Sequence, residues 1–211
     1  MEYCNYHKHD HISSIFTPDT HIRCEEYVKR AVELGHTTYF TTNHGSGGDI
    51  FEAKTICDKY KIRCLFGIEG YIVPNPLEKD NRNYHIIVIP TTNQARKKVN
   101  LITSKANIDG YYYKPRIFPE DLLALNKEDV YITTACVAGL LRDDDSYNKI
   151  FLPLAKHFED HMLLEVQTHN VDIQKDINKK CVELSEKMGL RLIAANDSHY
   201  IYPCQYKDRI E

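Results

Sequence analysis

The sequence predicts an α/β fold in which short buried strands alternate with amphipathic helices and close into a compact, distorted (β/α) barrel. About seven strand–helix repeats can be read along the 211 residues, of which 42% are hydrophobic. This length suits one sizeable core and is too short for two full domains, so we expect residues 1–211 to form a single domain. A doubly wound open sheet is the alternative, although no glycine-rich nucleotide loop follows the first predicted strand.

The predicted strands are short apolar segments. Segments 86–89 and 162–166 are almost continuously apolar, which is typical of strands that are buried on both faces. The segments that we expect to be strands are 2–6, 37–42, 64–73, 84–90, 130–135, 162–167 and 191–196.

The predicted helices are longer segments with apolar residues at helical spacing. Segment 24–34 ends at Gly35 and segment 173–188 ends at Gly189, and glycine is a common signal for the end of a helix. The other segments that we expect to be helices are 50–60, 93–105, 119–125 and 148–158, and the polar segments 74–83 and 106–116 are predicted loops.

Composition limits the possible partners. The net charge is −3 and the pI is about 6.4, so no broad basic surface is expected to hold long nucleic acid, although contact with a nucleic-acid end is still possible. No segment approaches the ~18 apolar residues of a membrane helix, and the start of the chain does not resemble a signal peptide. Seven cysteines without a paired framework indicate a reducing compartment, so we expect a cytoplasmic protein that does not bind a membrane.

Potential metal ligands follow most of the predicted strands. Reactive groups of a parallel barrel gather where its strands end, so these side chains are expected to meet at one rim. His7 and His9, like Asp197 and His199, are spaced two residues apart, and such pairs share one face of an extended chain. His85 instead opens its predicted strand, which means either that this strand runs antiparallel or that the barrel is irregular there.

The mixture of donors indicates transition metals. Imidazoles, carboxylates and a single thiol from Cys136 suit zinc, manganese or iron better than calcium or magnesium. Burying so many charged groups without a metal would be costly. Glu69 could alternatively be a structural acid in a salt bridge. Isolated histidines and cysteines are interpreted as ordinary surface and core residues, namely His21, His36, His157, His161, Cys57 and Cys181.

A series of motifs in order along the chain resembles the PHP (polymerase and histidinol phosphatase) superfamily, and most closely the amino-terminal PHP domains of bacterial DNA polymerase III alpha subunits. The motifs are YHKHDHISSIFTPD at 6–19, TTNHG at 41–45, FGIEGYIVP at 66–74, YHIIVI at 84–89, GYYYKPRI at 110–117, TTACVAGL at 133–140, LEVQTHN at 164–170 and AANDSHY at 194–200. The resemblance implies a distorted TIM-like barrel of seven strand–helix repeats.

The resemblance also implies two or three divalent transition-metal ions. One would be held by His7, His9, Glu69 and Asp197, and Glu69 would bridge to a second ion held also by His85 and Cys136. A third would be held by Asp19, His44 and His199, and the Asp19 position depends on matching a longer first loop found in some members. The family usually has Asp where this chain has Asn43, a residue that we expect to orient a ligand rather than bind metal.

The mechanism that we expect is attack on phosphorus by a metal-bound hydroxide, which makes Asp197 and Glu69 the essential acids. Lys114 and Arg116 could grip the substrate phosphate, or could belong to a solvated basic loop. His169 could bind substrate, donate a proton or be structural.

Three functions remain open. The first is hydrolysis at a 3′ DNA end, a 3′–5′ exonuclease or proofreading activity, in which Tyr111, Tyr112 and Tyr113 could stack on bases. The second is a small-molecule phosphomonoesterase of the histidinol-phosphatase kind. The third is a non-catalytic scaffold for replication proteins. Polymerase alpha chains continue beyond the position of Glu211, so we expect no polymerase active site in this sequence.

Overall fold

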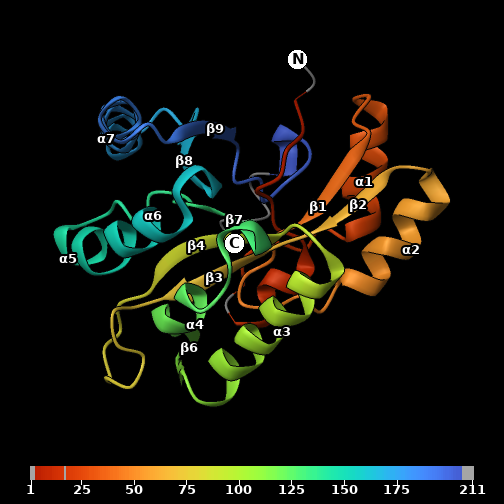
Figure 1. Cartoon of the computed structure of the whole chain (residues 1–211). Helices are drawn as coiled ribbons and strands as arrows, with labels where there is room; N and C mark the ends of the chain where they lie inside the picture. The colour runs from red at the N-terminus through yellow and green to blue at the C-terminus, as the bar shows by residue number, and fades with distance from the viewer. Residues whose placement is uncertain (1–2, 17, 206–211) are drawn as a thin grey trace. The chain divides into compact units, whose positions relative to one another are not determined.

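The computed structural model describes residues 3–16 and 18–205, which fall into two compact units. The first unit contains the described residues up to Ile68 and from Asn196 onward, and the second spans Glu69–Ala195. Each unit has its own sheet, and Figure 1 labels their helices and strands. No helix among the described residues is long and apolar enough to cross a membrane.

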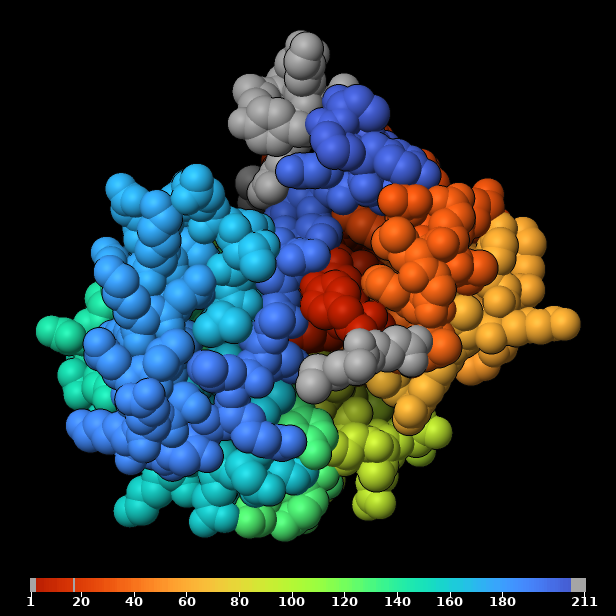
Figure 2. All heavy atoms as spheres, turned by 90° about the horizontal axis from the view of Figure 1, so that it is seen from above, coloured from red at the N-terminus to blue at the C-terminus, as the bar shows by residue number. Residues whose placement is uncertain are grey.

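The first unit is built on a two-stranded parallel sheet of β1 (Thr38–Thr41) and β2 (Arg63–Phe66), in which Tyr39 pairs with Cys64. Helices α1 (Cys24–Glu33) and α2 (Ile50–Tyr60) contact each other and lie side by side at the surface, as the orange segments of Figure 2 show. Their apolar faces pack with Ile22 and with Tyr39 of β1 into a small core, whose helical members are Cys24, Tyr27, Val28, Ala53 and Cys57.

The second unit contains a seven-stranded sheet in the order β5-β6-β3-β4-β7-β8-β9. Its strands are β3 (Ile68–Ile72, which begins one residue before the unit), β4 (Tyr84–Pro90), β5 (Tyr111–Tyr112), β6 (Lys114–Ile117), β7 (Val130–Thr133), β8 (Met162–Gln167) and β9 (Arg191–Ala195). Neighbours β3 and β6, β7 and β8, and β8 and β9 pair in parallel, whereas β4 runs antiparallel to β7 and β5 runs antiparallel to β6.

Helices cover this sheet. Helix α3 (Asn93–Ile108) packs on β4 and β6, and α7 (Asp172–Met188) packs on β8 and β9 (Figure 1). Helix α6 (Leu152–Phe158) packs on β8 and follows a one-turn π-helical segment, Tyr147–Phe151. The short helices α4 (Pro119–Leu123) and α5 (Asp144–Ser146) complete the unit.

Three predicted elements differ from the structure. The predicted strand 64–73 is two strands, β2 and β3, because the chain leaves the first sheet at Gly67 and enters the second. The predicted loop 106–116 contains the end of α3 and the β5–β6 hairpin. Residues 3–6 of the first predicted strand form no strand, and residue 2 lies outside the described residues.

A buried acid destabilises the first unit at neutral pH. Asp49 precedes α2 and is only 1% exposed. Burial, followed by the negative charge of Asp10, raises the pKa of Asp49 to about 7, although Lys8 opposes the shift. Because the unfolded chain releases this proton near the ordinary value of 3.8, the stability present below that value is lost as the pH rises toward 7.

We therefore expect Asp49→Asn to raise the free energy of unfolding at pH 8 by about 2 kcal/mol, because the amide carries no charge to bury. The gain should shrink as the pH falls through 7, be small at pH 4 and vanish only below the ordinary value of 3.8, where both folded and unfolded Asp49 bind the proton. Urea unfolding of both proteins across this pH range measures the difference. A gain of equal size at pH 4 and pH 8 would contradict the titration of Asp49.

Candidate metal centre

The two motifs with ligands two residues apart lie side by side in the first unit. Lys8 and Ser198 form a parallel β-bridge, and the backbone NH of His9 donates to the carbonyl of Ser198 at 2.8 Å. This register places the carboxylate of Asp197 against both histidines of the first motif. Its Oδ1 lies 3.3 Å from Nε2 of His7 and 3.1 Å from Nε2 of His9, and both imidazoles are fully buried.

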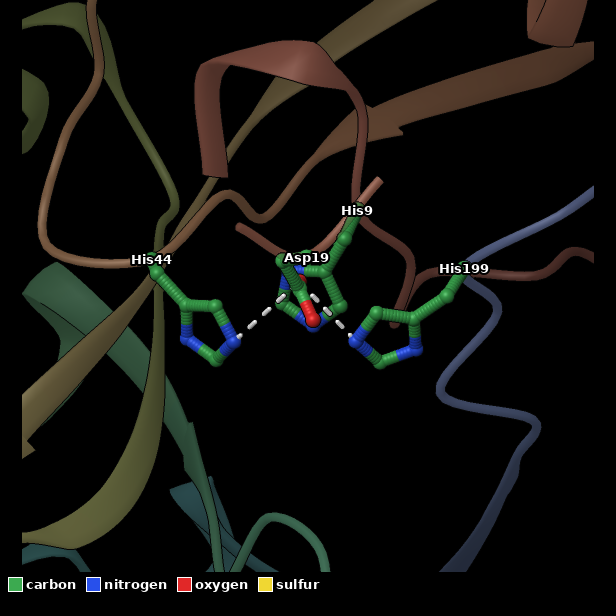
Figure 3. Close-up of side chains that lie close together, drawn as sticks. All are labelled: His9, Asp19, His44 and His199. Atoms are coloured by element: carbon green, nitrogen blue, oxygen red, sulfur yellow. Dashed lines mark ion pairs between the residues drawn. The ribbon is translucent and has the colours of Figure 1, made fainter. Parts of the chain in front are cut away.

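A second group in the same unit shares His9. Figure 3 shows the imidazoles of His9, His44 and His199 around the carboxylate of Asp19. Oδ2 of Asp19 lies 3.0 Å from Nε2 of His199 and 3.7 Å from Nε2 of His44. One nitrogen or oxygen atom from each of the four residues lies within 4.8 Å of all the others, which is close enough for one metal ion. The four ligands, at positions 9, 19, 44 and 199, are brought together from separate segments of the chain.

The hydrogen bonding of His199 fits a metal ligand. Its Nδ1 lies 2.9 Å from the backbone carbonyl of Asp197, which can only accept, so Nδ1 carries a proton. Nε2 then faces Oδ2 of Asp19 at 3.0 Å, so either a proton or a metal ion must lie between these two atoms. Burial raises the pKa of Asp19, but its contacts with His199 and the neighbouring imidazoles outweigh burial and hold that pKa below its ordinary value.

The second unit holds a smaller cluster of Glu69, His85 and Cys136. Oε1 of Glu69 lies 3.0 Å from Nδ1 of His85, and Sγ of Cys136 lies 3.5 Å from the same nitrogen and 4.0 Å from the same oxygen. Glu69 is fully buried and Cys136 is 8% exposed. An imidazole, a carboxylate and a thiol at these distances form a donor set suited to zinc or another transition metal.

The antiparallel strand β4 explains the place of His85. Ile87 of β4 pairs with Thr133 of β7, so the start of β4 lies beside the end of β7, from which the chain continues to Cys136. His85 is also held to the segment after Cys136, because it forms a parallel bridge with Gly139 and its NH donates to the carbonyl of Ala138. Of the two arrangements that the sequence left open for His85, the structure has the antiparallel one.

Each of the predicted metal ligands thus lies in one of two clusters. The first unit holds His7, His9, Asp19, His44, Asp197 and His199, and the second holds Glu69, His85 and Cys136.

Comparison with known proteins identifies the family. The family model for the PHP domain matches residues 7–169. This chain belongs to the PHP domain family. The PHP domain is similar to the DNA polymerase III alpha subunit of Treponema pallidum, with 27% identity covering 95% of this chain, and to that of Borreliella burgdorferi, with 29% identity covering 92%. It spans only 18% of the length of either relative.

Solved structures share the fold at low sequence identity. A protein of Bifidobacterium adolescentis that is predicted to be a metal-dependent phosphoesterase matches with a TM-score of 0.57 and 13% identity, covering 96% of this chain and 90% of its own. A two-domain protein of Bacteroides vulgatus with a predicted PHP-like phosphoesterase matches with a TM-score of 0.56 and 14% identity, covering 93% of this chain and 51% of its own. The predicted fold class, a distorted TIM-like barrel of the PHP type, is confirmed.

Arg116 of the PHP domain, for which the sequence left open a substrate contact or a solvated basic loop, has a buried structural position. It is 2% exposed, and its guanidinium donates to the backbone carbonyls of Pro76, Glu78, Asp80 and Gly110. These bonds tie the segment after β3 to the segment before β5, and they leave little of the guanidinium for a phosphate. Burial lowers the pKa of Arg116 slightly against the opposing charge of Asp80, but a guanidinium stays protonated.

We expect Arg116→Lys to lower the free energy of unfolding by about 3 kcal/mol, because one ammonium cannot reach four carbonyls and leaves buried acceptors unsatisfied. Chemical unfolding monitored by circular dichroism measures this change. Arg96→Lys on α3 is the control and should change stability by less than ~0.5 kcal/mol. If Arg116→Lys were as stable as the parent protein, the carbonyl contacts would contribute little.

The other two predicted substrate contacts are accessible. His169 is exposed just after β8, and Lys114 is half-buried, with Nζ 5.1 Å from the centre of the Tyr71 ring. Tyr111 and Tyr113 are 54% and 67% exposed. Sequence reasoning missed one buried residue, Ser13, which contacts the predicted metal ligand His9. Serine is common in turns, and only the turn after His9 brings its hydroxyl back to that imidazole.

Proposed function

We propose that this PHP domain is a metal-dependent phosphoesterase. The observation that supports the proposal best is the orientation of His199, whose Nε2 lone pair faces a carboxylate oxygen at 3.0 Å within a buried group of imidazoles. A proton or a metal ion must lie between these two atoms, and the convergence of three imidazoles and one carboxylate within 4.8 Å favours the metal ion. The relationship to proteins that are predicted to be metal-dependent phosphoesterases supports the same reaction class.

Each cluster has a defined part in this proposal. His7, His9 and Asp197 would hold one ion, Asp19, His44 and His199 another, and Glu69, His85 and Cys136 would provide ligands in the second unit. When bound, zinc, manganese or iron ions activate water as a nucleophile and stabilise negative charge on the phosphoryl oxygens. The protein itself determines which nitrogen atoms are free to bind metal. The carbonyl of Asp197 holds a proton of His199 on Nδ1, which leaves Nε2 for the ion. Burial keeps water away from His7 and His9.

Cys136 acts as a ligand in this proposal, not as an attacking group. Its thiol is 8% exposed and lies in contact with both Glu69 and His85. An attacking thiolate must reach the phosphorus, whereas a ligand only has to reach the ion. The activity would depend chiefly on the two acids, Asp197 and Glu69.

The substrate that we propose is the phosphodiester at a 3′ DNA end. Its support is the similarity to DNA polymerase III alpha subunits, which also makes replication proteins the proposed partners. Exposed Tyr111 and Tyr113 offer rings on which unpaired bases could stack, and Lys114 and His169 are accessible to a phosphate. A net charge of −3 agrees with contact to an end rather than along a duplex.

A panel of substrates tests the reaction and its substrate together. With manganese supplied, the 211-residue protein should shorten end-labelled single-stranded DNA from its 3′ end. Release of phosphate from histidinol phosphate, without shortening of DNA, would establish the phosphomonoesterase instead. If elemental analysis found bound metal but neither substrate reacted, the scaffold role would replace both. A protein that binds no transition metal would overturn the proposal.

A further inference from the structure

The imidazole of His9 is held through its Nδ1 atom by a buried hydroxyl. Oγ of Ser13 lies 2.8 Å from Nδ1 of His9 and accepts a hydrogen bond from the backbone NH of His44 at 3.1 Å. The same oxygen lies 2.8 Å from Oδ1 of Asn43. Ser13, Asn43 and His9 are each at most 1% exposed, so these contacts are shielded from solvent.

The backbone NH of Asp10 determines the direction of the hydrogen bonds in this chain of contacts. The NH of Asp10 donates to the Asn43 side chain at 2.9 Å, so the amide atom that faces it must be the oxygen, Oδ1. The only proton of the Ser13 hydroxyl must then point to Oδ1 of Asn43, since two oxygen lone pairs would otherwise meet at 2.8 Å.

The tautomer of His9 follows from these directions. Because the Ser13 proton is used on Asn43, the contact between Ser13 and His9 needs its proton from the imidazole, and Nδ1 of His9 carries it. The lone pair of the neutral ring then lies on Nε2, which faces Oδ1 of Asp197 at 3.1 Å. This is the orientation that a metal ligand requires.

We propose that Ser13 and Asn43 are positioning residues that lock His9 in the Nδ1-protonated tautomer and so present its Nε2 lone pair for metal. The proposal rests on the proposed metal site but concerns the protein before metal binds. Asn43 acts as an obligatory acceptor, and Ser13 passes that requirement on to the imidazole. Neither residue touches the ion or the substrate.

The tautomer can be observed directly. Long-range ¹⁵N–¹H spectra of the metal-free, histidine-labelled protein at alkaline pH should show the proton of His9 on Nδ1. In Asn43→Leu, the Ser13 hydroxyl loses its acceptor and can donate to Nδ1, so a share of His9 should shift to the Nε2-protonated form. Asn43→Asp keeps an acceptor oxygen and should retain the parent tautomer. A parent protein with the His9 proton on Nε2 would overturn the proposal without any variant.

Metal affinity provides the second measurement. Zn²⁺ titrated in competition with a chromophoric chelator should bind Ser13→Ala and Asn43→Leu about 10–100-fold more weakly than the parent protein. Thr42→Val is the matched control, because it removes an equally buried hydroxyl that bonds to the backbone of Tyr6 and Lys8 and, among the described residues, to no imidazole. It should lower stability but leave the His9 tautomer unchanged, with zinc affinity within about threefold of the parent.

The outcomes separate this proposal from the proposed function. Equal loss of zinc affinity in Thr42→Val and Ser13→Ala would show that general loosening, not the tautomer, weakens the site, and would overturn the positioning role. If the parent protein binds no zinc while His9 still carries its proton on Nδ1, the proposed phosphoesterase function would be overturned and the tautomer assignment would remain valid.

Discussion

We expect Asp197→Asn to lower the proposed phosphoesterase turnover by at least ~10³-fold, while the far-ultraviolet circular dichroism should stay that of the parent protein. Oδ1 of Asp197 lies 3.3 Å from Nε2 of His7 and 3.1 Å from Nε2 of His9, so its negative charge serves both imidazoles. The amide keeps the shape but supplies neither the charge nor the second acceptor.

Asparagine is the right replacement because of the backbone. Asp197 has a φ of 48°, in the left-handed region that aspartate and asparagine tolerate better than most residues. Alanine would add backbone strain to the loss of the ligand and confuse the two effects. Asp176→Asn on the exposed face of α7 is the control and should keep full turnover. Parent-like activity in Asp197→Asn would remove the acid from the proposed site.

Glu69→Gln is expected to reduce turnover by about 10²–10³-fold and to remove metal from the cluster in the second unit. Glu69 is fully buried, and its Oε1 contacts both His85 and Cys136. Glutamine has nearly the same shape, but it is neutral and its amide NH₂ cannot bind a cation. The loss should therefore come from the ion and not from packing.

Cobalt substitution gives a readout that does not depend on activity. A thiolate bound to Co²⁺ absorbs in the near ultraviolet, so the parent protein should show this band, Cys136→Ser should abolish it and Glu69→Gln should weaken it. Glu165→Gln is the matched control. Glu165 is equally buried in β8, but it accepts hydrogen bonds from Thr133 and Gln167, so its variant should lose stability and keep the cobalt band. An unchanged band in Cys136→Ser would exclude the thiol as a ligand.

The sequence predicted local structure best where one periodicity dominated. Helix α2 has the bounds that we predicted, and α1 and α7 end two residues and one residue, respectively, before the glycines that were used to predict their ends. The segment 64–73 was harder, because strand-forming residues continue on both sides of Gly67 and the sequence does not show that the chain changes sheet there. The role of Arg116 was also hidden, since backbone carbonyls carry no signal in a sequence.

The sequence by itself determined which side chains can bind metal and how they pair. Residue type sets the donor atom, and a spacing of two pairs His7 with His9 and Asp197 with His199 along the chain, so both features are local, although the φ of 48° at Asp197 shows that the second pair is not in extended chain. Only the tertiary structure decided that β4 turns back to bring His85 beside Cys136, that Arg116 is occupied by carbonyls, and that Ser13 and Asn43 govern the protons of His9. These depend on contacts between distant segments and on the directions of individual hydrogen bonds, which are defined only when the chain is folded.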